Sequence, residues 1–386
     1  MRISEALELI STLNKITQDE VIFTADARSR VLGEDIKASK SLPGFTNSAM
    51  DGYAYAWPDK DSALELVGTI YAGDFKDYEL KKGQCFRIMT GAKMPKGADS
   101  VMMQELAVFE NGKLKIHESA KGGENVRLRG EEFLEGSLIC EKGSVLGVTD
   151  LMSLYNFGVF SLLASKRLKI GVFASGAELF EAHERKGDNA VYNCNAIGIC
   201  SLFLEQDTRY LGILKDEKAS VKDALEGALN HFELVITMGA ASVGEADFIP
   251  EVLSELGFIR IVGGLKIKPG GPTKIYQKDN KFVLVLPGNP MAAYVASLVF
   301  GRALVARLTG AKYEPLKLRL ASQKDIKLKK GRENILLCHV VDGYLIGFCE
   351  QYSSAQIAPL MQNTHYAICE DFLAANTLVD VYELVK

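Results

Sequence analysis

The chain has 386 residues, 47% of them apolar and 24% charged, and a net charge of -4 at pH 7. A single hydrophobic core rarely exceeds roughly 250–300 residues, so this length predicts more than one domain. The slight negative charge argues against a general nucleic-acid or membrane-surface binder, because both need a basic face.

The N-terminal region begins with apolar residues at helical spacing over residues 4–16. Short apolar runs bounded by Gly, Asp or Lys follow, to about residue 165, for example residues 85–89, 100–103 and 137–140. Such runs are typical of strands, and no crossover helices separate them. The pattern therefore predicts a β-rich region that is not a parallel sheet.

The central region alternates apolar strands with helical segments. The predicted strands are residues 168–173, 208–214, 233–238 and 281–286, and the predicted helices are residues 196–205, 221–230, 249–256 and 291–309. Alternation of this kind indicates βαβ units and a parallel sheet that is buried on both faces.

The last part of the chain returns to short strands separated by Gly, Asp and polar turns, at residues 316–320, 335–340, 344–348 and 377–384. We expect a small β-barrel or a sandwich there. The predicted organisation is an N-terminal region over 1–165 with a β-rich subdomain at about 39–137, an α/β domain over 166–309, and a β domain over 310–386.

The chain is expected to be cytoplasmic. Its N-terminus lacks the apolar core of a signal peptide, and no stretch approaches the roughly 18 apolar residues of a membrane span. The seven cysteines include no Cys-x-x-Cys pair, which argues against a zinc site. They are expected to be buried or half-buried thiols in a reducing compartment.

Three glycine-containing segments, at residues 174–178, 239–247 and 287–290, directly follow predicted parallel strands. Ligands of open parallel sheets bind at the carboxyl ends of the strands. Glycine lets backbone approach a ligand closely, and helix N-termini suit phosphate. Together these loops predict a nucleotide or phosphate-ester cleft. Neither a P-loop nor a dinucleotide-binding glycine motif is present.

Several polar residues at these loops have two interpretations. Glu178 and Asp247 sit near predicted helix starts, where they could complement the helix dipole or cap it, or could instead hold Mg²⁺ against a phosphate. Asn195 caps a helix at minimum and could also bind a ligand. Lys266, Lys268 and Lys274 could neutralise phosphate or form a solvated turn.

In the β-rich region, Arg127 and Arg129 would face one side of a strand, as an anion clamp or as an ordinary surface ladder.

These segments together resemble the MoeA family, molybdopterin molybdenumtransferase, whose relatives include the E domain of gephyrin. The resemblance runs from about residue 4 to the C-terminus. It is carried by Asn47-Ser-Ala-Met-Asp-Gly-Tyr-Ala54, Arg87-Ile-Met-Thr-Gly-Ala92, Ser175-Gly-x-Glu178, Ser242-Val-Gly-Glu-x-Asp247, Lys268-Pro-Gly270 and Leu286-Pro-Gly-Asn-Pro290.

The resemblance implies a fold: a central three-layer α/β domain with a mostly parallel sheet, a β-rich N-terminal region whose first helix packs with the central domain, and a small C-terminal β-barrel. It also implies a reaction. The family binds adenylylated molybdopterin and molybdate with a divalent cation, expected to be Mg²⁺, inserts the metal into the dithiolene and releases AMP.

Site residues follow from the same resemblance. The catalytic candidates are Asp51, Thr90, Glu178 and Asp247, and Glu178 and Asp247 are the expected metal ligands. Pro287 and Pro290 would shape the pocket near the dithiolene. The substrate-binding candidates are Ser48, Arg127, Ser175, Gly176, Asn195, Gly239, Ser242, Gly244, Glu245, Lys266, Lys268, Pro287, Gly288, Asn289 and Pro290.

The family is also dimeric, so a homodimer is expected, with Asp51, Thr90 and Arg127 acting on the partner's cleft. Further expected partners are the adenylyltransferase that supplies the substrate and the apo-molybdoenzymes that take the product.

The chain departs from the family pattern at five positions. Two of the departures remove a charge from the proposed site, Ala177 in place of Asp and Gly271 in place of Lys. The others are Glu132 for Asp, Cys194 for Ser and Ala240 for Gly. The alternatives are therefore a catalytically weak paralogue, a binding scaffold, or a molybdopterin adenylyltransferase. The long β-rich N-terminal half argues against the last of these.

Overall fold

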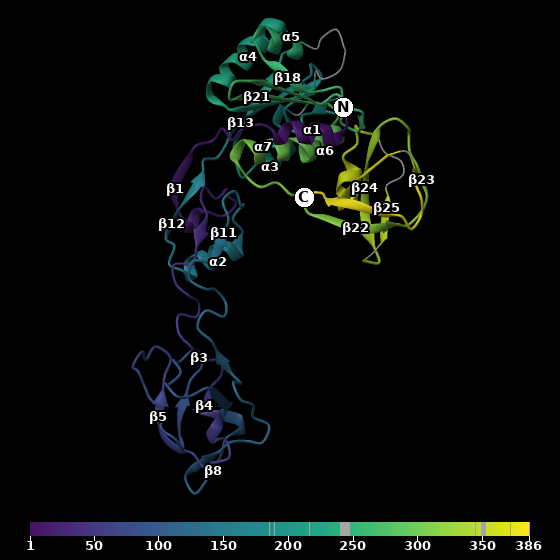
Figure 1. Ribbon diagram of the computed structural model, residues 1–386. Coiled ribbons are helices and arrows are strands. Elements are labelled where there is room, and N and C mark those ends of the chain that lie inside the picture. Colours follow the sequence, from purple (N-terminus) through teal and green to yellow (C-terminus); the bar gives the residue numbers. More distant parts are fainter. Residues whose placement is uncertain are drawn as a thin grey trace. The chain divides into compact units, whose positions relative to one another are not determined.

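The chain folds into two compact units, as the computed structural model shows (Figure 1). Unit 1 comprises Met1–Glu34, Lys142–Val148 and Ser161–Lys386, and unit 2 comprises Asp35–Glu141 and Thr149–Phe160. The structure describes residues 1–184, 186–188, 190–215, 217–239, 248–343, 345–348, 353–370 and 372–385.

The centre of unit 1 is a six-stranded mixed sheet in the order β16-β13-β17-β21-β20-β18. Four parallel strands confirm the prediction: β13 (Lys169–Ser175), β16 (Asp207–Leu214), β17 (Leu234–Met238) and β21 (Lys281–Leu286). Two antiparallel strands, which sequence analysis missed, complete the sheet: β20 (Lys274–Lys278) and β18 (Ile259–Val262).

Helices cover both faces of this sheet and give the predicted three layers (Figure 1). On one face, α4 (Lys218–His231) and α5 (Ile249–Glu255) pack on Val235, Val283 and Val285. On the other face, a second core joins Ile170, Ile236 and Leu284 to α1 (Ile3–Ser11), α3 (Asn195–Leu202), α6 (Pro290–Ala296) and α7 (Arg302–Thr309).

The helical run at residues 290–309 is interrupted by a π-helical turn, Ser297–Gly301. Pro290–Thr309 is long and apolar enough to cross a membrane, so the prediction that no stretch approached such a span was wrong. Its most apolar window is 78% buried inside the protein, as expected of a core helix. Burial against the sheet, rather than contact with lipid, explains its composition.

The C-terminal part of unit 1 is a closed barrel, which decides between the barrel and the sandwich. Its strand order is β24-β25-β22-β28-β26, and β24 pairs again with β26 to close it. The strands are β22 (Lys317–Ser322), β24 (Glu333–Val341), β25 (Leu345–Phe348), β26 (His365–Cys369) and β28 (Leu378–Glu383). The short strand β19 (Ile267–Lys268) pairs in parallel with the start of β24 and so joins the α/β part to the barrel.

Unit 2 is β-rich, as predicted. Its main sheet has the order β5-β6-β4-β7, with β4 (Gly52–Tyr55), β5 (Glu65–Ile70), β6 (Gln84–Ile88) and β7 (Ser100–Met103). The buried apolar side chains of unit 2 include two separate clusters. One contains Ile70 and Ile88, and the other contains Tyr55 and Leu64. Beside this sheet, β3 (Asn47–Ser48) pairs with β10 (Val126–Arg127).

Candidate functional site

The carboxyl ends of β13, β17 and β21 touch one another through glycine. Gly239 has φ 93°, and a Cβ on it would lie 2.2 Å from the carbonyl oxygen of Ser175. A Cβ on Gly288 would lie 3.3 Å from the Cα of Gly239. The backbone N–H of Gly239 donates to the carbonyl of Leu286 at 3.2 Å. The predicted convergence of three loops is therefore present for the residues that the structure describes, and two of the three segments contribute a glycine, without a side chain, to its centre.

Asn195 reaches across this edge. Its Nδ2 donates to the carbonyl oxygen of Gly288 at 2.7 Å. It is the first residue of α3, whose N-cap is Cys194, and the N–H of Ala196 in the first turn donates instead to Asn193 Oδ1 at 3.2 Å. The interpretation of Asn195 as a helix cap was wrong. Its side chain links the segment after β13 to the loop after β21.

The loop after β21 leads directly into α6, as predicted. Pro287 is buried, Gly288 and Asn289 are exposed, and Pro290 is the first helical residue. The Asn289 side chain donates through Nδ2 to Ser354 Oγ at 2.9 Å, and Met291 N donates to the carbonyl of the same serine at 3.1 Å. Two hydrogen bonds thus hold this loop against the segment that precedes α8 (Ala358–Gln362).

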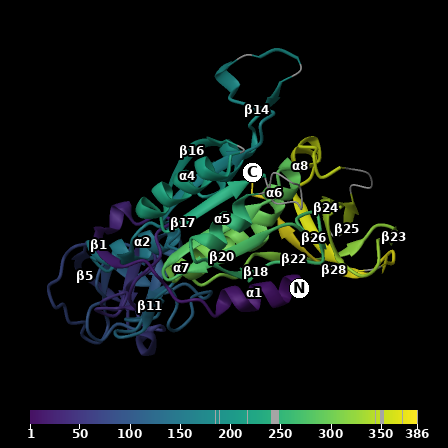
Figure 2. The same cartoon turned by 90° about the horizontal axis from the view of Figure 1, so that it is seen from above.

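Glu178 follows Ser175 and Gly176 at the end of β13 and is exposed. Its carboxylate folds back over Gly176, where a Cβ would lie 2.8 Å from one of its oxygens. The chain then forms β14 (Leu179–Phe180) and β15 (Val191–Tyr192), which stand away from the α/β layers (Figure 2). Glu178 does not lie at a helix start, so the interpretation that it complements a helix dipole was wrong.

The structure describes only part of the predicted metal site. Ser242, Gly244, Glu245 and Asp247 lie outside the described residues. Among the residues that are described, no three His, Cys, Asp or Glu side chains cluster as a metal site. Glu178 remains as one exposed carboxylate, and within the described chain no donor is hydrogen-bonded to it.

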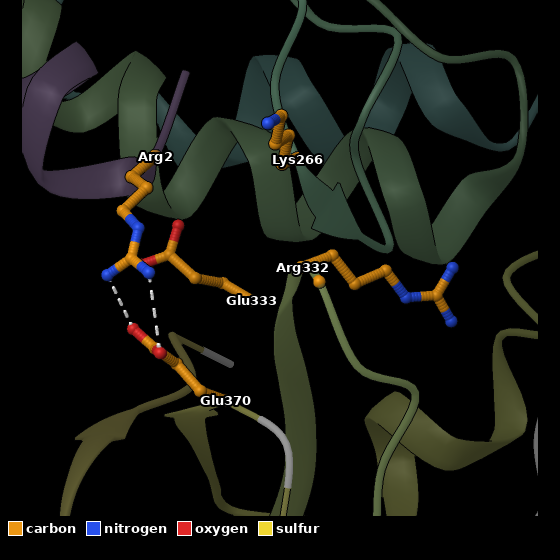
Figure 3. Close-up of a pocket in the computed structure, with 6 residues that line it drawn as sticks. Arg2, Lys266, Arg332, Glu333 and Glu370 are labelled. Atoms are coloured by element: carbon orange, nitrogen blue, oxygen red, sulfur yellow. Dashed lines mark hydrogen bonds and ion pairs between the residues drawn. The ribbon is translucent and has the colours of Figure 1, made fainter.

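Of the three lysines predicted to neutralise phosphate, Lys266 and Lys268 flank buried Ile267 and are both exposed, whereas Lys274 is half-buried at the start of β20. Lys268 pairs through its backbone with Asn334 of β24. Lys266 lines a cavity together with Arg2, Arg332 and other residues of unit 1 (Figure 3).

A second polar group gathers in unit 2. Thr90 donates through both its backbone N and its Oγ1 to Asp51 Oδ1, at 2.7 and 2.8 Å. These bonds hold the pKa of the Asp51 carboxyl below its usual value: the backbone bond contributes most, then the hydroxyl. Gly91 N donates to the carbonyl of Ser48, and exposed Arg127 pairs with Asn47 on the neighbouring strand.

The four candidates of this region, Ser48, Asp51, Thr90 and Arg127, therefore share one end of unit 2. The prediction that Arg127 and Arg129 face one side of a strand was wrong, because β10 ends at Arg127 and does not reach Arg129.

Two features of the candidate sites were missed. Asn47 is 8% exposed, and its Oδ1 has no hydrogen-bond partner among the described residues. In the sequence, Asn47 is only the first residue of a motif, with no signal that its side chain is buried. Cys194 is exposed next to Asn195, so the expectation of buried or half-buried thiols was wrong there, although Cys85, Cys140, Cys338 and Cys369 are buried.

Comparison with protein families and known proteins gives a consistent result. A model of the MoeA N-terminal region (domain I and II) matches residues 1–158, and a model of the probable molybdopterin binding domain matches residues 171–307. The molybdopterin molybdenumtransferase of Haemophilus influenzae is 35% identical over 302 residues, covering 77% of this chain and 74% of that protein. The protein of the same name from Nostoc sp. is 27% identical and covers 97% and 91%.

Solved structures share the whole fold. The molybdopterin biosynthesis moeA protein from Pyrococcus horikoshii superposes with a TM-score of 0.84 at 24% identity, covering 100% of both chains. A molybdenum cofactor biosynthesis protein from Pyrococcus furiosus gives 0.63 at 18% identity, covering 100% and 99%.

The layered fold, the meeting of glycine loops at the strand ends and the two matched family models define a multidomain protein of molybdopterin metabolism. With 35% identity over most of both chains, it belongs to the molybdopterin molybdenumtransferase (MoeA) family, whose members are enzymes of molybdenum-cofactor biosynthesis.

Proposed function

We propose that this protein inserts molybdenum from molybdate into adenylylated molybdopterin and releases AMP. The observation that supports this best is the contact of Ser175, Gly239 and Gly288 at the strand ends. Where glycines bring three chain segments this close together, a phosphorylated ligand can approach peptide N–H groups closely. The phosphoanhydride of the substrate would lie over this point.

Side chains around the edge would orient the substrate. The Asn195 amide is held by its bond to Gly288, so its remaining donor and acceptor have a fixed direction. Lys268 is exposed and would neutralise phosphate charge. Buried Pro287 and partly exposed Pro290 would form the rigid wall near the dithiolene.

The residues at this edge suit Mg²⁺. The ion takes one or two carboxylates, substrate phosphate oxygens and water rather than a cage of protein ligands. Exposed Glu178 offers such a carboxylate, and Asp247, which lies outside the described residues, would be the second. Bound there, Mg²⁺ would withdraw charge from the phosphoanhydride and make AMP a better leaving group.

We further propose that the protein acts as a homodimer. The cleft lies on unit 1, whereas Asp51, Thr90 and Arg127 lie on unit 2. In the proposed arrangement, unit 2 of one protomer supplies these groups to the cleft of its partner. An adenylyltransferase would deliver the substrate and apo-molybdoenzymes would accept the product, in the cytoplasm, without nucleic acid or a membrane as partner.

The reaction is tested by mixing purified protein with adenylylated molybdopterin, molybdate and Mg²⁺, and measuring AMP release and cofactor-bound molybdenum. Release that requires both molybdate and Mg²⁺ is the expected result. Glu178→Gln should slow release by about 100-fold, as expected when an electrostatic stabiliser of the transition state is lost. Exposed Glu205 on the same unit provides the control, and Glu205→Gln should keep full activity. Binding of the adenylate without any release would refute the proposal and indicate a scaffold.

The shared site is tested by mixing two inactive variants. An Asp51→Asn protomer and a Glu178→Gln protomer form mixed dimers in which one cleft has both functional groups only if unit 2 acts on the partner's cleft. Recovery of up to about half the activity of the wild-type protein per mixed dimer is expected on this symmetry argument. Failure to recover activity, with exchange of protomers verified, would show that each chain uses its own groups.

A further inference from the structure

A chain of hydrogen bonds leads from the edge of the central sheet to Asn195 of the strand-end cleft. It begins at Tyr210 of β16, the edge strand next to β13. Leu214 of the same strand pairs with Ser175, whose carbonyl lies at the cleft. Tyr210 precedes Leu214 by four residues, roughly 13 Å of strand. Its hydroxyl can therefore act on the cleft only through other residues.

The Tyr210 hydroxyl has two partners, one on each side of the β14–β15 pair. It donates to Glu181 Oε1, directly after β14, and accepts from Asn193 Nδ2 at 2.8 Å, directly after β15. Burial and the bond to Glu181 raise the pKa of Tyr210, so the hydroxyl keeps its hydrogen near neutral pH. Because that hydrogen is donated to Glu181, a lone pair of the oxygen faces Asn193.

Asn193 is held through three of its polar groups. Its backbone N donates to the carbonyl of Phe180 at 2.9 Å, and its Oδ1 accepts from the backbone N of Ala196 at 3.2 Å. The third group is Nδ2, which Tyr210 engages. The two ends of an amide differ, so the bond to Tyr210 helps to fix which end faces Ala196. A reversed amide would leave that N–H in the first turn of α3 without its acceptor.

The first turn of α3 carries this order to the cleft. Asn195 lies one residue before Ala196, and its Nδ2 donates to the carbonyl of Gly288 at 2.7 Å. Gly288 in turn lies against Gly239. A shift of the first turn of α3 therefore moves Asn195 relative to two of the loops of the cleft. A misplacement of about 1 Å at an active site can cost roughly 100-fold in rate.

We propose that Tyr210 is a positioning residue for the reaction: through Asn193 it holds the first turn of α3, and thereby the Asn195 amide, at the strand-end cleft. This inference rests on the proposed function, because it concerns how the same cleft orients its substrate. Tyr210 itself does not touch the substrate, so loss of its hydroxyl should affect the rate of the reaction more than substrate binding. A tyrosine that only anchored the β14–β15 pair would leave both unchanged.

The first test is hydrogen–deuterium exchange of the full-length, substrate-free protein, followed by mass spectrometry. Tyr210→Phe removes only the hydroxyl. Peptides that span residues 194–200 should exchange about tenfold faster in this variant, because Ala196 N–H loses a fixed acceptor and one hydrogen bond typically has an effect of this size. Exposed Tyr192 of β15 supplies the matched control, since Tyr192→Phe removes the same atom from the same region and should leave the exchange unchanged.

The second test measures AMP release from adenylylated molybdopterin with molybdate and Mg²⁺. In Tyr210→Phe, kcat should fall about tenfold while KM stays within about twofold of the wild-type value. Combining this variant with Asn195→Ala shows whether the two residues act together. If Tyr210 acts through Asn195, the double variant should be within about threefold of Asn195→Ala alone, whereas two independent losses would multiply to about 100-fold.

The inference is overturned if Tyr210→Phe releases AMP at the wild-type rate, if its loss multiplies with that of Asn195→Ala, or if exchange in the first turn of α3 is unchanged. Absence of AMP release by the wild-type protein would instead refute the proposed function. The exchange measurement uses no substrate, so it would still decide whether Tyr210 holds α3.

Discussion

Thr237 provides a sharp test of the packing described above. It lies on β17 between Phe173 and Val285 of the neighbouring strands, and it is fully buried. Its Oγ1 has no hydrogen-bond partner among the described residues. A buried hydroxyl without a partner costs about 1–3 kcal/mol. Valine has nearly the same shape, so Thr237→Val should raise the free energy of unfolding of unit 1 by about 1–2 kcal/mol.

A second buried threonine is the matched control. Thr273 is also fully buried, but its Oγ1 donates to the carbonyl of Gly270 at 2.7 Å. Thr273→Val removes that bond and should lower the free energy of unfolding by about 1 kcal/mol. The same chemical change is therefore expected to have opposite signs at the two positions.

Urea denaturation followed by far-ultraviolet circular dichroism measures both variants. The single tryptophan, Trp57, lies in unit 2 and reports separately on that unit by fluorescence. Its transition should stay unchanged in both variants. If Thr237→Val lowered the stability of unit 1 by 1 kcal/mol or more, the hydroxyl would have a bonding partner and the reasoning would be refuted.

Three further outcomes are expected. Thr90→Val removes the hydroxyl donor, so the pKa of Asp51 should rise toward its ordinary value in a carbon-13 NMR titration. The lowered pKa stabilises the folded protein at higher pH, and this contribution is lost on acidification. It should therefore be smaller in the variant. Asn195→Ala should slow AMP release by about tenfold and change the melting temperature little, because one positioned hydrogen bond is lost at an accessible site. Gly239→Ala should lower the stability of unit 1 by about 2–4 kcal/mol in urea, because its φ is 93° and the new Cβ would lie 2.2 Å from Ser175 O.

The strands at the centre of the sheet could be predicted because burial on both faces demands an uninterrupted apolar sequence. In β17 and β21, nearly every residue is buried. β18 and β20 lie at the edge, where charged and apolar residues mix and the apolar run is lost. The length of an uninterrupted apolar sequence therefore identifies the central strands of such a sheet better than its edge strands.

The position of the candidate site at the strand ends could be predicted from the sequence, but the hydrogen bonds between its residues could not. Glycine after a buried strand is a local signal, and it located the loops at Ser175, Gly239 and Gly288. The Asn195 bond joins residues 93 positions apart, which no local pattern encodes. Glu178 was placed before a helix because the strands that follow it have only two residues each and leave no periodic signature.

The packing of α1 against α7 brings together two segments that are about 290 residues apart and are therefore synthesised at different times. Ile3, Ala6 and Ile10 are buried in the core that includes α7, and Ile16 N donates to the carbonyl of Leu308 at 2.9 Å. A ribosome adds roughly 5–20 residues per second, so tens of seconds pass between the emergence of α1 and that of its binding surface. During that interval the apolar face of α1 has no partner, while unit 2, whose last segment ends at Phe160, has all the residues it needs to fold. The nascent chain should therefore bind chaperones through α1. Deleting α1 should reduce this chaperone binding and should leave the fold of unit 2 unchanged.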